Sequence, residues 1–203
     1  METGDLLDQL GYTAPNCLLG RELERAPDYG HVFRRATNKK GIGLQAVYCL
    51  RPSSKNRAAE QPPPLVPVTY VCRAATLDDA DRIHRLVWNQ SVAPFVIVLA
   101  QDGVRLYSGF ERTSQAGASA PSAFLVEATL ADAADKLRAL SAESIDSGEV
   151  WDEWGAKVRP ERRVEWRLLA DLRKLEHQLG SAGLKDRSLI HSLIGKYVYL
   201  HYL

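Results

Sequence analysis

With 203 residues, the chain is long enough for one well-buried domain and a smaller appendage, and its 45% hydrophobic and 25% charged residues are typical of a globular protein in water. No apolar run approaches the roughly 20 residues of a membrane-spanning helix, and the acidic beginning METGDLLDQLG lacks the apolar segment of a secretory signal. A net charge of +1 excludes a uniformly basic protein but leaves room for local basic surfaces.

The N-terminal part of the chain predicts short helices followed by a β-hairpin. Residues 5–10 and the segment CLLGRELER after Pro15 have the apolar spacing of short helices. Two segments rich in β-forming residues follow, HVFRRATN and IGLQAVYCLR, and the turn Asn38-Lys39-Lys40-Gly41 between them suits a hairpin. The next stretch, RPSSKNRAAEQPPP, has no periodicity and is predicted to be a solvated loop.

The middle of the chain predicts a strand, a helix and two further strands. The run VPVTYVCRA indicates the first strand, and a helix is expected from Thr76 to about Asn89, with Asp79 placed to complete a capping box. The run PFVIVLA is apolar enough for a strand that is buried on both faces, and Asp102-Gly103 turns it into VRLYSGF. If the strands that flank the helix pair in parallel, the connection is a right-handed crossover.

The C-terminal part of the chain predicts an edge strand and then helices. FLVEA suits the edge strand, and Thr129–Leu140 suits an amphipathic helix. VEWRLLADLRKLEHQLG has one leucine stripe, whereas DRSLIHSLIGKYVYLHYL is apolar on two faces and needs neighbours on both sides. We therefore predict a mixed α/β fold, with an α/β domain over residues 1–143 and a helical segment over residues 144–203. The last apolar pattern has no stop signal, so we expect the natural chain to extend past Leu203.

The cysteines Cys17, Cys49 and Cys72 are odd in number, far apart and without a CxxC pair. We expect reduced thiols in a cytoplasmic protein and no zinc site, with Cys49 and Cys72 in strand cores.

Four segments carry a family resemblance: ADRIHRLVWNQSVAPFVIVLAQDGVRLYSGF, SIDSGEVW, RRVEWRLLADLRKLEHQL and LIGKYVYLHYL. They resemble the N-terminal regions of DNA adenine-N6 methyltransferases from restriction-modification and phage-defence systems, from about residue 65 onward. The resemblance implies the front module of an enzyme that uses S-adenosylmethionine. The chain has neither the glycine-rich turn for that cofactor nor the Asn/Asp-Pro-Pro-Tyr/Phe loop for the flipped adenine, so we expect no methyl transfer and no cofactor in this fragment.

The order of hairpin, strand, helix and two strands also resembles the core of PD-(D/E)XK nucleases. In those enzymes, carboxylates on the second and third strands hold Mg²⁺ against the scissile phosphate. Here the corresponding segments, GLQAVYCL and VTYVCRA, contain no carboxylate. We therefore predict a degenerate nuclease-like core with no catalytic residues and no metal ligands.

Positive charge is concentrated in the same region. Between Gly30 and Leu77, Glu60 is the only acid. Eight bases occur there: Arg34, Arg35, Lys39, Lys40, Arg51, Lys55, Arg57 and Arg73. One interpretation is contact with the DNA backbone, because each neutralised phosphate adds salt-dependent affinity. The other is a set of solvated side chains that keep strand edges from pairing with other chains.

Three functions stay open. The first is a non-catalytic DNA-binding and assembly module of a DNA adenine methyltransferase in restriction-modification or phage defence, with DNA and other subunits as partners and no membrane contact. The second is an active Mg²⁺-dependent nuclease with displaced carboxylates such as Glu22, Glu24 or Asp28. The third is a protein-interaction or oligomerisation domain that does not touch DNA.

Overall fold

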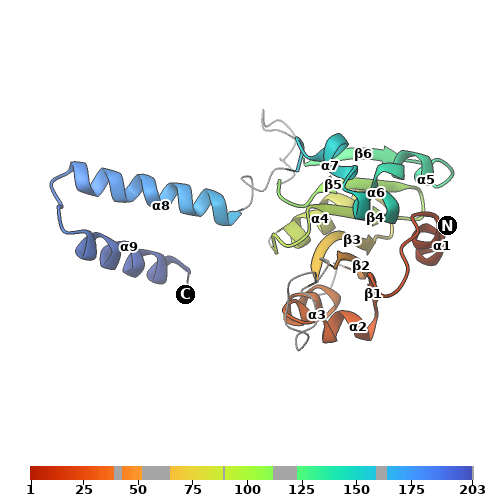
Figure 1. Cartoon of the computed structure of the whole chain (residues 1–203), viewed down its shortest axis with the longest axis horizontal. Helices are drawn as coiled ribbons and strands as arrows, with labels where there is room; N and C mark the ends of the chain where they lie inside the picture. Colours follow the sequence, from red (N-terminus) through yellow and green to blue (C-terminus); the bar gives the residue numbers. More distant parts are fainter. Residues whose placement is uncertain (39–42, 52–64, 89, 112–122, 159–163, 203) are drawn as a thin grey trace. The chain divides into compact units, whose positions relative to one another are not determined.

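The computed structural model describes residues 1–203 apart from 39–42, 52–64, 89, 112–122, 159–163 and 203 (Figure 1). The chain forms two compact units, Met1–Pro160 and Glu161–Leu203, which we call the α/β unit and the helical unit. The predicted mixed α/β class is confirmed, since the first unit contains a six-stranded mixed sheet and the second consists of helices.

The strands of the sheet lie side by side in the order in which they occur along the chain. They are β1 (Cys17–Leu19), β2 (Leu44–Leu50), β3 (Val66–Arg73), β4 (Phe95–Leu99), β5 (Val104–Ser108) and β6 (Phe124–Ala128). Each neighbouring pair is antiparallel except β3 and β4, which are parallel. The 3-10 turn η1 (Leu77–Asp79) and α4 (Ala80–Trp88) connect these two strands, as the sequence predicts.

Helices cover both faces of the sheet, and β4 shows why the sequence requires this. All five β4 side chains are buried. Val96 and Val98 pack into a core beneath α2 (Arg21–Arg25), α3 (Gly30–Asn38) and α4. Phe95 and Ile97 point the other way, into a second core. The elements above that second core are α1 (Thr3–Gln9), α5 (Ala133–Lys136), the 3-10 turn η2 (Arg138–Leu140), α6 (Ala142–Ser147) and α7 (Val150–Trp154).

The predicted hairpin from HVFRRATN to IGLQAVYCLR is wrong in its first half, because residues 30–38 form the helix α3. Phe33 and Ala36 lie three residues apart and are both fully buried, while His31, Arg34 and Arg35 are exposed. This is the spacing of a helix with one buried side. The antiparallel neighbours of β2 are β1 and β3, and residues 39–41 of the proposed turn lie outside the described residues.

The capping box proposed for Thr76 and Asp79 is also absent, since the Thr76 side chain makes no capping hydrogen bond. The Leu77 amide instead donates to a carboxylate oxygen of Asp102, 3.0 Å away, in the turn after β4. The helix expected over residues 129–140 is reduced to the short α5 and the turn η2.

The two compact units divide at residues 160 and 161, later than the expected boundary at residues 143 and 144. The side chains of Ile145, Val150, Trp154 and Val158 explain the difference, because all four are buried in the second core of the α/β unit. Residues 144–158 are thus part of the α/β unit.

The helical unit consists of α8 (Val164–Ser181) and α9 (Arg187–Tyr202), with Gly183 in the turn at φ +101°. Near the turn, a carboxylate oxygen of Glu176 accepts hydrogen bonds from Arg187 and His191 at 3.1 and 3.2 Å. Ile190 is buried, whereas Leu189 and Leu193 remain half exposed. Within the described parts of the chain, no helix has both the length and the apolar character needed to cross a membrane.

Candidate nucleic-acid interface

Helix α3 is fixed to the sheet through its apolar side. The ring of Phe33 lies edge-on to the ring of Tyr70 on β3, with the centroids 5.8 Å apart, and it stacks against Tyr29 at the same distance. Gly30 begins the helix, and a side chain there would meet the backbone carbonyl of Glu24 on α2. These contacts hold α3 close to both β3 and α2.

The opposite side of α3 exposes its basic residues. Arg34 and Arg35 are both exposed, and His31 lies one turn before them. Residues three and four positions apart share one side of a helix, so these side chains form a single surface. Helix α3 contains no carboxylate. Because this segment was predicted to be a strand, His31 was not placed beside Arg34 and Arg35. The helical spacing of residues 31, 34 and 35 could have revealed that the three side chains share one surface.

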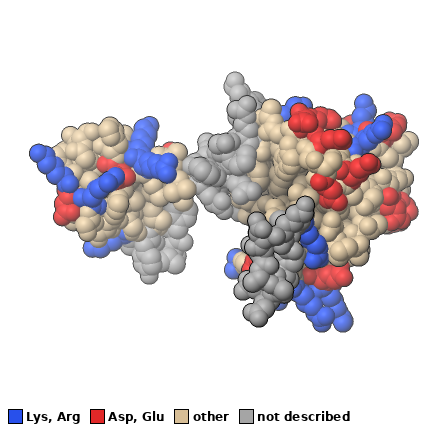
Figure 2. Space-filling view, in the orientation of Figure 1, with Lys and Arg blue, Asp and Glu red and all other residues tan. Residues whose placement is uncertain are grey.

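The neighbouring helix α2 has mixed charge. Leu23 is buried, and Arg21 and Arg25 are exposed beside Glu22 and Glu24. Figure 2 shows basic side chains gathered over α2 and α3, at the lower end of the α/β unit in this view.

The eight bases singled out from the sequence do not form one surface among the described residues. The structure brings Arg34 and Arg35 together on α3. Arg51 instead donates to the carbonyl oxygen of Pro15 at 2.7 Å, and Arg73 forms an ion pair with Glu2 at 2.7 Å. The remaining four lie outside the described residues: Lys39, Lys40, Lys55 and Arg57.

Strands β2 and β3 contain no carboxylate but carry buried hydroxyl groups. Tyr12 stacks on Tyr48 of β2 with ring centroids 4.3 Å apart, and its hydroxyl lies 3.2 Å from the hydroxyl of Thr69 on β3. The Tyr12 hydroxyl donates to the carbonyl oxygen of Leu140 at 2.7 Å, and that of Tyr48 donates to Asp146 at 3.0 Å. Burial raises the pKa of Tyr48 to about 12, so this hydroxyl stays protonated at neutral pH.

The displaced carboxylates considered above do not assemble into a site. A carboxylate oxygen of Glu22 accepts a hydrogen bond from the Leu19 amide at 3.3 Å. Asp28 precedes α3 with φ +64°. Among the residues that the structure describes, no three His, Cys, Asp or Glu side chains lie close enough together to hold a metal ion.

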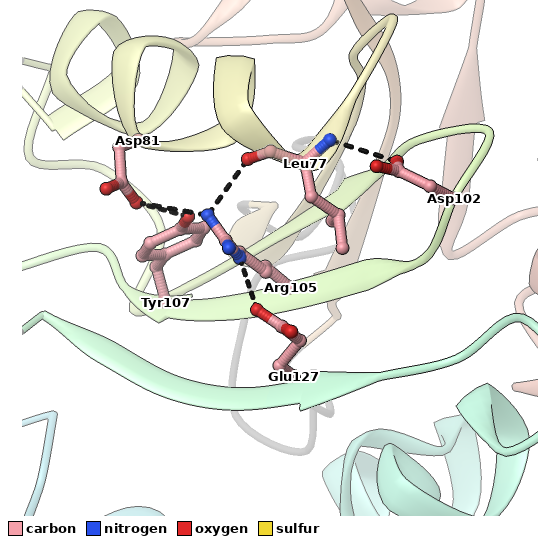
Figure 3. A network of polar contacts seen from close by, with 6 residues as sticks. All are labelled: Leu77, Asp81, Asp102, Arg105, Tyr107 and Glu127. Carbon is pink, nitrogen blue, oxygen red and sulfur yellow. Dashed lines mark hydrogen bonds and ion pairs between the residues drawn. The ribbon is translucent and has the colours of Figure 1, made fainter.

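A second polar cluster surrounds Arg105 on β5 (Figure 3). The guanidinium group donates to Glu127 of β6 at 2.7 Å and to the carbonyl oxygen of Leu77 at 2.9 Å, and it lies 3.8 Å from Asp81 of α4. The Tyr107 hydroxyl donates to the same carboxylate of Asp81 at 2.6 Å. Both carboxylates are therefore held by partners within the chain, and the cluster joins the start of α4 to β5 and β6.

Comparison with known proteins gives no match: no family model, no curated protein and no solved structure matches the chain.

Proposed function

We propose that the α/β unit is a non-catalytic module that holds the backbone of DNA, and that it serves as the N-terminal positioning module of a DNA adenine methyltransferase in restriction-modification or phage defence. The observation that carries the proposal is α3, which has its apolar side anchored on the sheet while Arg34 and Arg35 are exposed on a helix without carboxylates. The assignment to a methyltransferase rests on the sequence patterns of the later segments alone, since no family model matches the chain.

Two features of α3 suit phosphate contact. Arginine presents a planar group of N–H donors that can bind two phosphate oxygens at once. Because Phe33 and Ala36 are fully buried, the backbone that carries Arg34 and Arg35 is fixed before DNA arrives, so less conformational freedom is lost on binding. Two such contacts add affinity that depends on salt but not on base sequence. The expected role is therefore to position DNA for a reaction carried out elsewhere.

A non-catalytic role is supported by the chemistry of the central strands. Neither β2 nor β3 contains a carboxylate, and the polar side chains buried on these strands include Tyr48 and Thr69. A Mg²⁺-dependent nuclease would need carboxylate oxygens beside the scissile phosphate.

The proposal can be tested by fluorescence anisotropy with the full chain and a labelled duplex of about 20 base pairs, over about 50 to 200 mM salt. We expect binding that weakens with salt, and a variant Arg34→Gln/Arg35→Gln whose log–log salt slope is smaller by about 2. Its affinity at about 100 mM salt should fall roughly 10- to 50-fold. The matched control is Lys136→Gln/Arg138→Gln, which removes two exposed bases from the opposite side of the sheet and should change affinity less than about 2-fold.

Two results would contradict the proposal. Binding that is absent or independent of salt would favour a domain that does not touch DNA. Mg²⁺-dependent cleavage that disappears in Glu22→Ala would favour the nuclease with displaced carboxylates.

A second candidate function, protein assembly, is favoured by α9. Leu189, Leu193 and Tyr197 are 50%, 44% and 56% exposed and recur every four residues along one side of the helix. An exposed apolar stripe of this kind is typical of a contact surface. Sedimentation of the full chain tests it for contact between copies: we expect a dimer that Leu193→Glu converts to a monomer, and a wild-type monomer at all concentrations would exclude self-association.

A further inference from the structure

The helical layers on the two sides of the sheet differ in charge, although η1 and α4, which lie on the same side as α2 and α3, carry two arginines and three carboxylates. We call α2 and α3 the basic face, and α1 together with residues 129–158 the acidic face. The helices of the basic face contain four arginines and two carboxylates. Residues 129–158 contain seven carboxylates and three basic side chains, all of them exposed, and α1 adds Asp5 and Asp8. Figure 2 shows acidic side chains gathered over α5, α6 and α7, away from the basic side chains over α2 and α3.

This separation follows from how the chain covers the sheet. Leu23, Phe33 and Ala36 place the basic face over one core, whereas Leu6, Leu137 and Ile145 place the acidic face over the other. The two surfaces therefore lie on opposite sides of one unit and cannot both contact a single straight duplex. A duplex carries one negative charge per roughly 1.7 Å of its axis, so it is repelled by one face and attracted by the other.

We infer that duplex DNA binds the α/β unit only through the basic face, and that the acidic face fixes the orientation of the unit by repelling phosphates. The inference rests on the proposed function and adds to it the side from which DNA approaches. No ligand is assigned to the acidic face. Its effect is to remove the wrong orientations of the encounter complex, as like charges do at specific interfaces.

The distance over which the repulsion acts decides whether it changes the affinity for DNA or only the orientation in which DNA binds. Two helical layers and a sheet separate the outer surfaces by roughly 30 Å. At about 0.15 M salt, electrostatic effects decay over about 8 Å, so the acidic face does not weaken contacts made on the far side. Phosphates that approach the acidic face itself lie within that range. The acidic face therefore sets orientation at physiological salt and lowers affinity only when salt is low.

The test places a DNA-cleaving iron chelate on either face of the full chain through one introduced cysteine. Glu24→Cys on α2 and Asp152→Cys on α7 are a matched pair, because each replaces one exposed carboxylate. The native Cys17, Cys49 and Cys72 are buried, so the introduced thiols take the label. We expect strand cleavage of a bound duplex from the Glu24→Cys conjugate, and at least 10-fold less from the Asp152→Cys conjugate.

A third variant tests repulsion directly. Asp135→Asn/Glu149→Gln/Glu153→Gln removes three exposed carboxylates from the acidic face. Affinity should change less than about 2-fold at 0.15 M salt and rise several-fold at about 0.01 M salt, where the decay length reaches about 30 Å. Cleavage from an Asp152→Cys conjugate should also increase in this background.

The outcomes separate the inference from the function on which it depends. If the wild-type chain does not bind duplex DNA in the anisotropy experiment, the proposed function fails and the inference fails with it. If the chain binds DNA but both conjugates cleave equally, or only the Asp152→Cys conjugate cleaves, the function stands and the inference is wrong. Binding without cleavage from either conjugate also overturns the inference, because DNA would then contact neither helical face.

Discussion

The imidazole ring of His84 on α4 is stacked on the phenol ring of Tyr107 on β5, with the centroids 4.6 Å apart and the planes 14° apart. His84 Nε2 lies 2.8 Å from the carbonyl oxygen of Ser108, and the side chain is fully buried. Burial lowers the pKa of His84 to about 4, although the hydrogen bond to Ser108 and the nearby Asp81 carboxylate act in the opposite direction. The ring is therefore neutral at pH 7 and packs as part of the core.

This neutral histidine predicts acid lability of the α/β unit. The unfolded chain binds a proton at His84 below its ordinary pKa of 6.5, whereas the folded chain does so only near pH 4. Stability should thus be independent of this group above pH 6.5 and fall between pH 6.5 and 4. The two pKa values correspond to a loss of roughly 3 kcal/mol across that window. Urea unfolding at several pH values measures it.

The control for this prediction is His84→Gln, whose amide can keep a donor near the Ser108 carbonyl without a titratable group. Its free energy of unfolding should be lower at pH 7 but vary less between pH 6.5 and 4 than that of the wild type. An equal slope in both proteins would show that other groups cause the acid lability.

The cluster around Arg105 predicts a modest contribution to stability. Its partners Asp81 and Glu127 have side chains that are 51% and 48% exposed, so water can solvate them when the guanidinium group is removed. Arg105→Met should therefore lower the free energy of unfolding by only about 1 to 2 kcal/mol, which includes the loss of the bond to the Leu77 carbonyl. Arg82→Met removes the ion pair with Asp79 within one exposed helix turn and should cost less than about 0.5 kcal/mol. A loss above about 4 kcal/mol for Arg105→Met would contradict this account.

The buried cysteines predict slow thiol chemistry. Burial raises the pKa of Cys17 to about 11 and that of Cys49 and Cys72 to about 12. The thiolate is the reactive form, so a disulfide reagent at pH 8 should modify all three thiols at least about 100-fold more slowly in the native chain than in urea. A single thiol that reacts rapidly in the native chain would show that its strand opens locally.

Sequence patterns predicted the centre of the fold because the signal there is local. The run PFVIVLA is apolar at every position, which suits a strand covered on both faces, and the helix before it has one apolar side. The spacing of Phe33 and Ala36 was equally local and indicated a helix. The β-forming residues of HVFRRATN were given more weight, so the segment of α3 was predicted to be a strand. The pair Arg34 and Arg35 was still found, because charge can be counted without knowing the element that carries it.

Contacts between distant residues could not be predicted in this way. The start of η1 is capped by Asp102, which lies 25 residues after Leu77 in the sequence. The Tyr12 hydroxyl meets Thr69 and Leu140, which are 57 and 128 residues away. The opposite charges of the two faces depend on which helices cover which side of the sheet, and this is fixed only by the complete topology.

The position of the unit boundary predicts how the chain can be shortened. Residues 1–160 should fold cooperatively, whereas residues 1–143 should not. The second fragment lacks Ile145, Val150, Trp154 and Val158, which are 1%, 0%, 5% and 2% exposed in the α/β unit. Losing the burial of each large apolar side chain costs about 1.5 to 3 kcal/mol, and the core surface that they cover would be exposed in addition. The total approaches the roughly 5 to 15 kcal/mol by which an ordinary domain is stable.

Thermal unfolding followed by near-ultraviolet circular dichroism distinguishes the two fragments. A sharp transition is expected for residues 1–160 and a broad one, or none, for residues 1–143. Trp154→Ala in the longer fragment is the graded control, and it should lower the free energy of unfolding by about 3 to 5 kcal/mol because the indole ring packs within the second core. Equal transitions for the two fragments would mean that residues 144–158 are not needed to close that core, and that the boundary near residue 143 inferred from the sequence was the correct one.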